Sequence, residues 1–455
     1  MDAKGRIAKA AGLMSIATFI SRVLGYVKDM ILARYFGATG LSDTFFVAFR
    51  IPNLLRELFA EGSMSSAFIP VLTEYHTKQG FGEAKRLVRI TFTFILAFVG
   101  LVSLLGILFA PAIVTLIAPG FLGTGKFSLT VLLTRVMFPF LLFISLAALV
   151  MGALNTRRVF FIPSLAPALL NVTIIASIVS IAPVMEHPII AVAIGVALGG
   201  LVQFAFQMPS FFRQGYDLRT DFGFRHPGLK KMSLLILPAT MGMAVAQVNI
   251  FVSTILASYL PQGSITYLYY AMRLIQFPIG IFGVAMGMAV LPALSEHAVR
   301  GEIDKLREDF SFALRLLFFL TVPSMAGLIA LRGPIVNILF QRGLFDYEAT
   351  VGTADALLFY SLGIWAVVGV RVVTAAFYSL QDTKTPVRVA VVAMVTNIVM
   401  SLLLMGPLKH AGLAFANAIA SGANFMLLFY FLRKRLGRVD ARKILKSFAK
   451  VCGAS

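Results

Sequence analysis

The sequence predicts an all-α polytopic membrane protein, with about twelve transmembrane helices in two pseudo-symmetric six-helix lobes around a central cationic cavity. Three observations predict this class: a very apolar composition, an internal repeat, and charged residues inside apolar stretches. Of the 455 residues, 59% are hydrophobic and only 13% are charged, and the mean hydropathy is +0.88. A chain with so little polar surface needs lipid rather than water around it.

Apolar stretches long enough to cross a bilayer recur along the whole chain. A helix of about 20 residues covers the hydrocarbon core. Stretches bounded by charge, Gly or Pro predict twelve helices, at 10–36, 41–73, 88–118, 127–154, 160–183, 187–212, 230–260, 265–296, 311–331, 351–379, 386–406 and 411–432. Residues 439–455 are predicted to form a basic C-terminal tail or the start of a thirteenth helix.

The distribution of Lys and Arg predicts the orientation. The formal net charge is +20, and the basic residues concentrate in alternate loops. By the positive-inside rule these loops and both termini are cytoplasmic. The same bias explains the net charge without nucleic acid as a partner. Arg22 interrupts the first apolar run and no small-residue cleavage site follows, so this run predicts a transmembrane helix rather than a cleaved signal.

The chain also repeats itself. ILARYFGATGLSDTFFVAFRI, from Ile31, resembles ILASYLPQGSITYLYYAMRLI, 224 residues later, and FIPVLTEYH resembles VLPALSEHA at an offset of 222. These matches predict an N-terminal lobe over 1–221 and a C-terminal lobe over 222–438, with the boundary in a basic linker from Arg213 to Lys231. Because each lobe has an even number of helices, we expect parallel repeats with the substrate site between them.

Four basic residues lie inside predicted membrane helices: Arg22, Lys28, Arg56 and Arg273. Charge in the hydrocarbon core is costly and usually marks a functional site. An interior with several cations favours an anionic ligand, and the planar fork of arginine suits phosphate. Less specific interpretations stay open for three of them: Arg22 could snorkel to the interface, and Lys28 and Arg56 could form structural ion pairs with nearby acids. Arg273 has no acid nearby in the sequence and is the strongest ligand candidate.

Motifs for catalysis and metal binding are missing from the sequence. There is no Walker A, HExxH or GxSxG pattern. Cys452 is the only cysteine, and the five histidines have no ligand spacing. The sequence therefore predicts a transporter rather than an enzyme, with no cofactor and no metal site.

Three segments resemble the MurJ (MviN) family of bacterial lipid II flippases. They are SRVLGYVKD from Ser21, SDTFFVAFRIPNLLRELFAEGSMSSAFIPVL from Ser42, and YAMRLIQFPIGIFGVAMGMAVLPALS from Tyr270. The resemblance implies the fold of the multidrug, oligosaccharidyl-lipid and polysaccharide exporters. It also implies alternating-access transport of lipid II, the undecaprenyl-pyrophosphate-linked disaccharide-pentapeptide, to the outer leaflet of the inner membrane. Expected partners are lipid II, membrane lipids, and cell-wall synthesis and division proteins.

The resemblance also assigns roles to single residues. Arg22, Arg56 and Arg273 match cavity arginines that bind the pyrophosphate and headgroup, and Lys28 stands where the family commonly has another arginine. Three acidic residues match positions implicated in gating and in holding those cations: Asp29, Asp43 and Glu61.

Two departures from the family pattern and two other functions remain open. Asn397 and Ser401 stand where some members have an Asn and an Asp that help bind sodium, so membrane potential is the expected driving force. Members usually continue into two further helices beyond the end of this sequence. The alternatives to lipid II transport are export of another polyprenyl-linked glycan or amphiphilic anion, and a non-transporting membrane scaffold for cell-wall synthesis.

Overall fold

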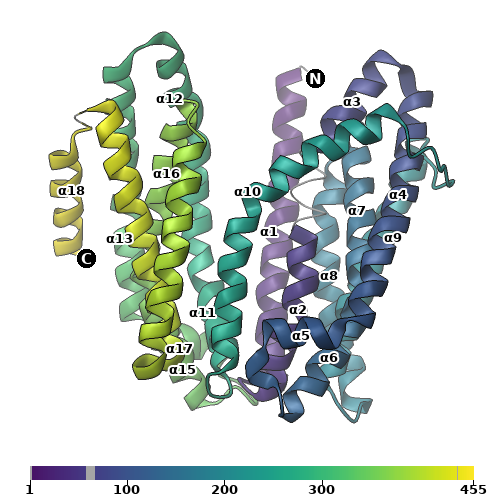
Figure 1. The fold of residues 1–455 in the computed structure, drawn as a ribbon, viewed down its shortest axis with the longest axis horizontal. Coiled ribbons are helices and arrows are strands. Elements are labelled where there is room, and N and C mark those ends of the chain that lie inside the picture. Colours follow the sequence, from purple (N-terminus) through teal and green to yellow (C-terminus); the bar gives the residue numbers. More distant parts are fainter. Residues whose placement is uncertain (1–2, 58–66, 438) are drawn as a thin grey trace. The chain divides into compact units, whose positions relative to one another are not determined.

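The computed structural model describes residues 3–57, 67–437 and 439–455, and their side chains except those of 3–11 and 236–246. The described residues form helices joined by short connections, without a β-strand (Figure 1). This confirms the all-α prediction. Helices are the expected solution for so apolar a chain, because they satisfy every backbone hydrogen bond within one segment.

The chain divides into two compact units, Met1–Gln247 and Val248–Ser455. The division falls inside one helix, α10, whereas the lobe boundary between 221 and 222 stays a prediction about the membrane-inserted halves. The first unit contains α1 (Ala3–Phe36), α2 (Gly40–Arg56), α3 (Ile69–Lys78), α4 (Gly80–Leu108), α5 (Ala110–Ile117), η3 (Pro119–Phe121), α6 (Gly125–Met137), α7 (Pro139–Thr156), α8 (Phe161–Ser180), η4 (Ala182–Val184), α9 (Ile189–Arg213) and most of α10 (Pro227–Ser258).

The second unit repeats this order of helices. It contains α11 (Ser264–Pro278), η5 (Ile279–Val284), α12 (Ala285–Arg300), α13 (Ile303–Ala330), α14 (Arg332–Phe340), α15 (Tyr347–Ser361), α16 (Ile364–Ser379), α17 (Lys384–Leu436) and α18 (Ala441–Ala454). Helices α2 and α11 begin 224 residues apart, and α4 and α13 begin 223 residues apart, as do α8 and α17. The repeat seen in the sequence is therefore also a repeat of helix positions.

Within the described residues, eight helical stretches are long and apolar enough to cross a membrane. They comprise α4, α8, α9, α13, α17 and the continuous pairs α6–α7, α11–α12 and α15–α16. Helix α17 leaves helical geometry at Lys409 (φ 50°, ψ −130°), between the two helices predicted at 386–406 and 411–432. The total of twelve crossings stays a prediction.

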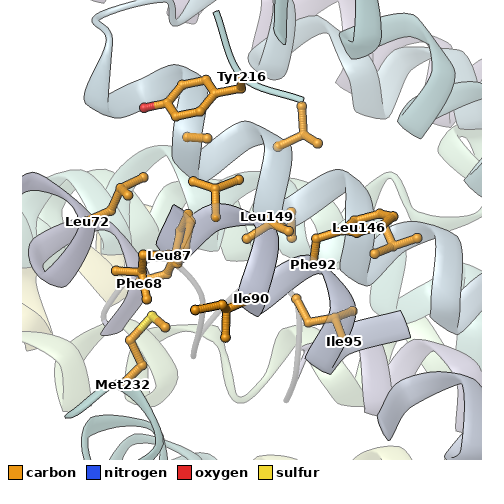
Figure 2. Packing of buried hydrophobic residues seen from close by; sticks show 14 of the residues in the cluster. Phe68, Leu72, Leu87, Ile90, Phe92, Ile95, Leu146, Leu149, Tyr216 and Met232 are labelled. Atoms are coloured by element: carbon orange, nitrogen blue, oxygen red, sulfur yellow. The ribbon is translucent and has the colours of Figure 1, made fainter. Parts of the chain in front are cut away.

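A large hydrophobic cluster holds the first unit together (Figure 2). Phe68 at the start of α3, Leu87 and Ile90 on α4, and Leu146 and Leu149 on α7 are all buried in it. The cluster extends into the segment after α9, where the Tyr216 ring lies against those of Phe81 and Phe211. This packing attaches the basic linker to the first unit.

Two acidic residues fasten the same linker to α4. Arg89 donates to both carboxylate oxygens of Asp217, and Lys85 Nζ lies 3.0 Å from Asp217 Oδ2. The hydrogen bond from Arg89 holds the pKa of the Asp217 carboxyl well below its usual range. Four residues on, Asp221 Oδ2 lies 3.4 Å from Arg86 Nε. The linker is thus held against α4 by ion pairs, although its composition resembles that of a flexible basic loop.

The turn inside α17 should tolerate no side chain at Gly412. A Cβ added there would overlap the Leu404 carbonyl group, lying 2.6 Å from its carbon. We therefore expect Gly412→Ala to destabilise the protein by about 3 kcal/mol, because the backbone must shift to relieve the overlap. Thermal unfolding in detergent measures the loss. Gly422→Ala is the matched control, since a Cβ at Gly422 of the same helix meets nothing within 4 Å. Equal melting temperatures for the two variants would contradict the expectation.

Candidate functional site

Three of the predicted site residues lie on α1. Asn171 of α8 donates its Nδ2 to the Ser21 carbonyl oxygen at 3.2 Å. This bond joins α8 to α1 at the residue before Arg22. Asp29 is only 1% exposed, and Lys28 Nζ lies 2.9 Å from its Oδ1. Arg22 is exposed and stands two helical turns before Asp29 on the same face. No described acidic side chain lies within ion-pairing distance of Arg22. Among the described residues, Arg22 is thus exposed and not ion-paired, whereas Lys28 is ion-paired with Asp29.

Asp43 is buried in the first turn of α2. Its side chain is 2% exposed, and its Oδ2 lies 4.0 Å from Lys126 Nζ at the start of α6. Lys126 also stands over the ring of Phe121, with Nζ 5.3 Å from the centroid. The α1–α2 turn beside it is held by Ser42, whose Oγ donates to the Gly37 carbonyl oxygen at 2.7 Å. Sequence reasoning missed Lys126 as the partner, because the two residues are distant in the chain.

Arg56 lies at the end of α2 in a polar network. Its Nε donates to Asn53 Oδ1 at 3.1 Å, and its Nη2 lies 3.9 Å from Glu57 Oε1. Asn53 Nδ2 donates to the same Glu57 oxygen at 3.0 Å, and Gln247 Nε2 of α10 donates to Glu57 Oε2 at 2.6 Å. Among the described residues, Glu57 is an acid beside Arg56, and the predicted Glu61 lies outside the described residues.

Glu57 is a site residue that sequence reasoning missed. Consecutive residues of an α-helix point about 100° apart, so an adjacent acid is not an obvious partner. Here Glu57 keeps α-helical backbone angles (φ −62°, ψ −39°), and Asn53 joins the two side chains by hydrogen bonding to both Arg56 and Glu57. The charge was visible in the sequence, but this local geometry was not.

Arg273 lies on α11 in the second unit and is half-buried. Helix α11 ends at Pro278 and continues as the π-helix η5. Gly283 in η5 allows close contact with α16, since a Cβ there would lie 2.9 Å from Val368 and 3.3 Å from Arg371 Cδ. The π-helix η5 thus begins six residues after Arg273, and Arg371 of α16 packs against it.

Two asparagine side chains in the second unit form an amide pair. Asn397 Nδ2 donates to Asn249 Oδ1 at 2.7 Å, and Asn397 and Ser401 are both buried. Within the described part of the chain, no group of three or more His, Cys, Asp or Glu side chains could hold a metal ion.

Comparison with known proteins places this arrangement in a family. The family model described as lipid II flippase MurJ matches residues 32–455. The chain belongs to this family. A probable lipid II flippase MurJ of Vibrio cholerae is 39% identical over 93% of this chain and 82% of its own length. The lipid II flippase MurJ of Burkholderia cenocepacia is 37% identical over 96% and 86%, respectively.

Solved structures agree with the family assignment. A lipid II flippase MurJ in an inward closed conformation matches with a TM-score of 0.79 and 28% identity, covering 96% of this chain and 92% of its own. An inward-facing transporter of the multidrug resistance MATE family, in the MOP superfamily, has a TM-score of 0.78 over 95% and 99% at 13% identity, which shows a shared fold only. The chain is thus a multi-pass membrane protein with the fold of this exporter superfamily.

Proposed function

We propose that the chain translocates lipid II from the cytoplasmic to the outer leaflet of the bacterial inner membrane by alternating access. The observation that carries this proposal is the match to the lipid II flippase MurJ family over residues 32–455. The cations on its membrane helices support it, because they suit a pyrophosphate-bearing headgroup. No bond is made or broken in the cycle, so the activity is transport rather than catalysis. Both termini are cytoplasmic in this proposal.

The basic residues have distinct roles in the proposed cycle. Arg22, Arg56 and Arg273 bind the pyrophosphate and the headgroup through their guanidinium groups, which can each donate two parallel hydrogen bonds to phosphate. Lys28 adds charge without that geometry. Because Lys28 is paired with Asp29 at 2.9 Å, substrate phosphate competes with the carboxylate for the ammonium group. Asp29, Asp43 and Glu61 hold the cations when the substrate is absent and contribute to gating.

Reconstituted transport tests the proposed function. Purified protein in liposomes is expected to move fluorescent lipid II from one leaflet to the other, measured by quenching from outside the liposomes. The same chain is expected to restore growth of a bacterium depleted of its own flippase. A polyprenyl-pyrophosphate-linked glycan without the pentapeptide is the control substrate. Equal transport of both lipids would exclude a specific lipid II flippase.

Neutralising Asp29 should strengthen headgroup binding and slow transport. Asp29→Asn removes the carboxylate that competes for Lys28, so affinity for the headgroup is expected to rise about tenfold, as charge-assisted hydrogen bonds predict. Tighter binding of the headgroup before translocation then slows the release of lipid II. Binding of lipid II to protein in detergent and the transport assay measure the two effects. Glu186→Gln, in an exposed loop of the same unit, is the matched control. Weaker binding in Asp29→Asn would show that Asp29 does not compete with substrate.

A further inference from the structure

A pocket of about 680 Å³ opens in the second unit where the end of α13 meets α14 and α15. Its volume lies in the range of small-molecule binding sites. The lining combines two charged side chains, Arg332 and Asp355, with the ring of Tyr347 and the apolar side chains of Ile338 and Val351. None of these residues belongs to the proposed substrate site.

Among the described residues, neither charge of the pocket is ion-paired. Arg332 donates its Nη1 to the Ile329 carbonyl oxygen at 2.9 Å, and no described carboxylate lies within ion-pairing distance of it. Asp355 is half-buried, and no described Lys, Arg or His lies within ion-pairing distance of its carboxylate, although it interacts at longer range with His410. Although both line one pocket, they do not pair with each other. Partly buried charge without a partner is unfavourable, so the pocket suits a ligand with one group of each sign.

The pocket lies between the ends of two helical stretches that are long and apolar enough to cross a membrane. Two of the membrane-crossing stretches meet there, since α13 ends at Ala330 and the α15–α16 stretch begins at Tyr347. At the same level, Ile338 is 66% exposed, Val351 40% and Tyr347 71%. Exposed apolar side chains beside an aromatic ring are typical of the interface between headgroups and acyl chains.

Polar contacts between the end of α14 and the start of α15 hold this side of the pocket in place. Asn337 Nδ2 donates to Gln341 Oε1 at 2.5 Å, and Thr350 Oγ1 donates to the same oxygen at 3.0 Å. These bonds join α14 to α15 across the pocket, so the spacing between Arg332 and Asp355 is preorganised.

We propose that this pocket binds the headgroup of a zwitterionic phosphoamine lipid. Arg332 donates to the phosphate, Asp355 accepts from the ammonium group, and the lipid tails lie beside Ile338 and Val351. A purely anionic headgroup would leave Asp355 unpaired beside added negative charge, which disfavours it. The bound lipid would join α13, α14 and α15, and this site is independent of the proposed lipid II transport.

Lipid retention tests the proposal. The protein and its Arg332→Gln and Asp355→Asn variants are placed in nanodiscs of phosphatidylethanolamine or of phosphatidylglycerol, extracted into detergent, and bound lipid is counted by native mass spectrometry. We expect each variant to bind phosphatidylethanolamine about tenfold more weakly, as loss of one charge-assisted hydrogen bond predicts. Arg342→Gln is the matched control, since Arg342 is exposed on the following loop and does not line the pocket.

Two further measurements use the unaltered protein, so a variant that fails to fold does not decide the outcome. Phosphatidylethanolamine is expected to raise the melting temperature, whereas phosphatidylglycerol is not. Free phosphoethanolamine added in detergent separates a membrane lipid from a soluble ligand of the same chemistry, and is expected to bind far more weakly than the lipid. Equal retention of the two lipids, unchanged retention in both variants, or tight binding of free phosphoethanolamine alone would overturn the proposal.

Discussion

Replacing Arg273 by Ala is expected to abolish lipid II transport while leaving expression near normal. The residue is a half-buried cation in the second unit, and hydrogen bonds to charged groups contribute about 1.5 to 3 kcal/mol each. Loss of a bidentate contact with phosphate therefore predicts a fall of about 100-fold or more. Arg22→Ala and Arg56→Ala are expected to act in the same way.

Replacement of the same arginines by Lys separates charge from geometry. Lysine keeps the positive charge but cannot form two parallel hydrogen bonds, so we expect partial activity. Arrival of lipid II in the outer leaflet is the measurement. Arg300→Ala, an exposed arginine on α12 that pairs with Glu296 at 2.7 Å, serves as the control in the same unit. Full transport by Arg273→Ala would remove Arg273 from the proposed substrate site.

Much of the fold is predictable because hydropathy and length decide where helices can lie in a membrane. The helix predicted at 160–183, for example, is α8 at Phe161–Ser180, followed by the short η4. Departures come from local geometry that composition does not encode. After Pro278, for example, η5 is a π-helix. Helix α14 is too short for a crossing and was not among the predicted helices.

The site shows a similar division between what sequence reasoning finds and what it misses. Charged residues in apolar stretches are visible because their cost in lipid is large, and this cost is the basis on which Arg22, Lys28, Arg56 and Arg273 are predicted as site residues. Their partners depend on tertiary contacts. Lys126 reaches Asp43 only because α6 packs on α2, and the pocket at Arg332 forms only when α13, α14 and α15 meet.

Transport is expected to depend on membrane potential and to be nearly indifferent to sodium. Sodium binding needs several oxygen ligands, and a carboxylate helps to offset the cost of dehydration. In the second unit, Asn249 Oδ1 already accepts from Asn397, and the Asn397 and Ser401 oxygens are neutral. By contrast, each net charge that crosses the membrane during the cycle couples to the potential by about 2.3 kcal/mol per 100 mV.

Proteoliposomes in which the sodium gradient and the potential are set independently provide the measurement. A valinomycin-imposed potential of 100 mV should change the rate up to about 50-fold for one charge moved in the limiting step. A sodium gradient alone should change it little. Ser401→Asp places a carboxylate one helical turn from the buried Asn397. If transport is independent of sodium because these oxygens are neutral, this variant is expected to become sodium-dependent. Strict dependence of the unaltered protein on sodium, with no response to potential, would show that a cation site exists elsewhere in the chain.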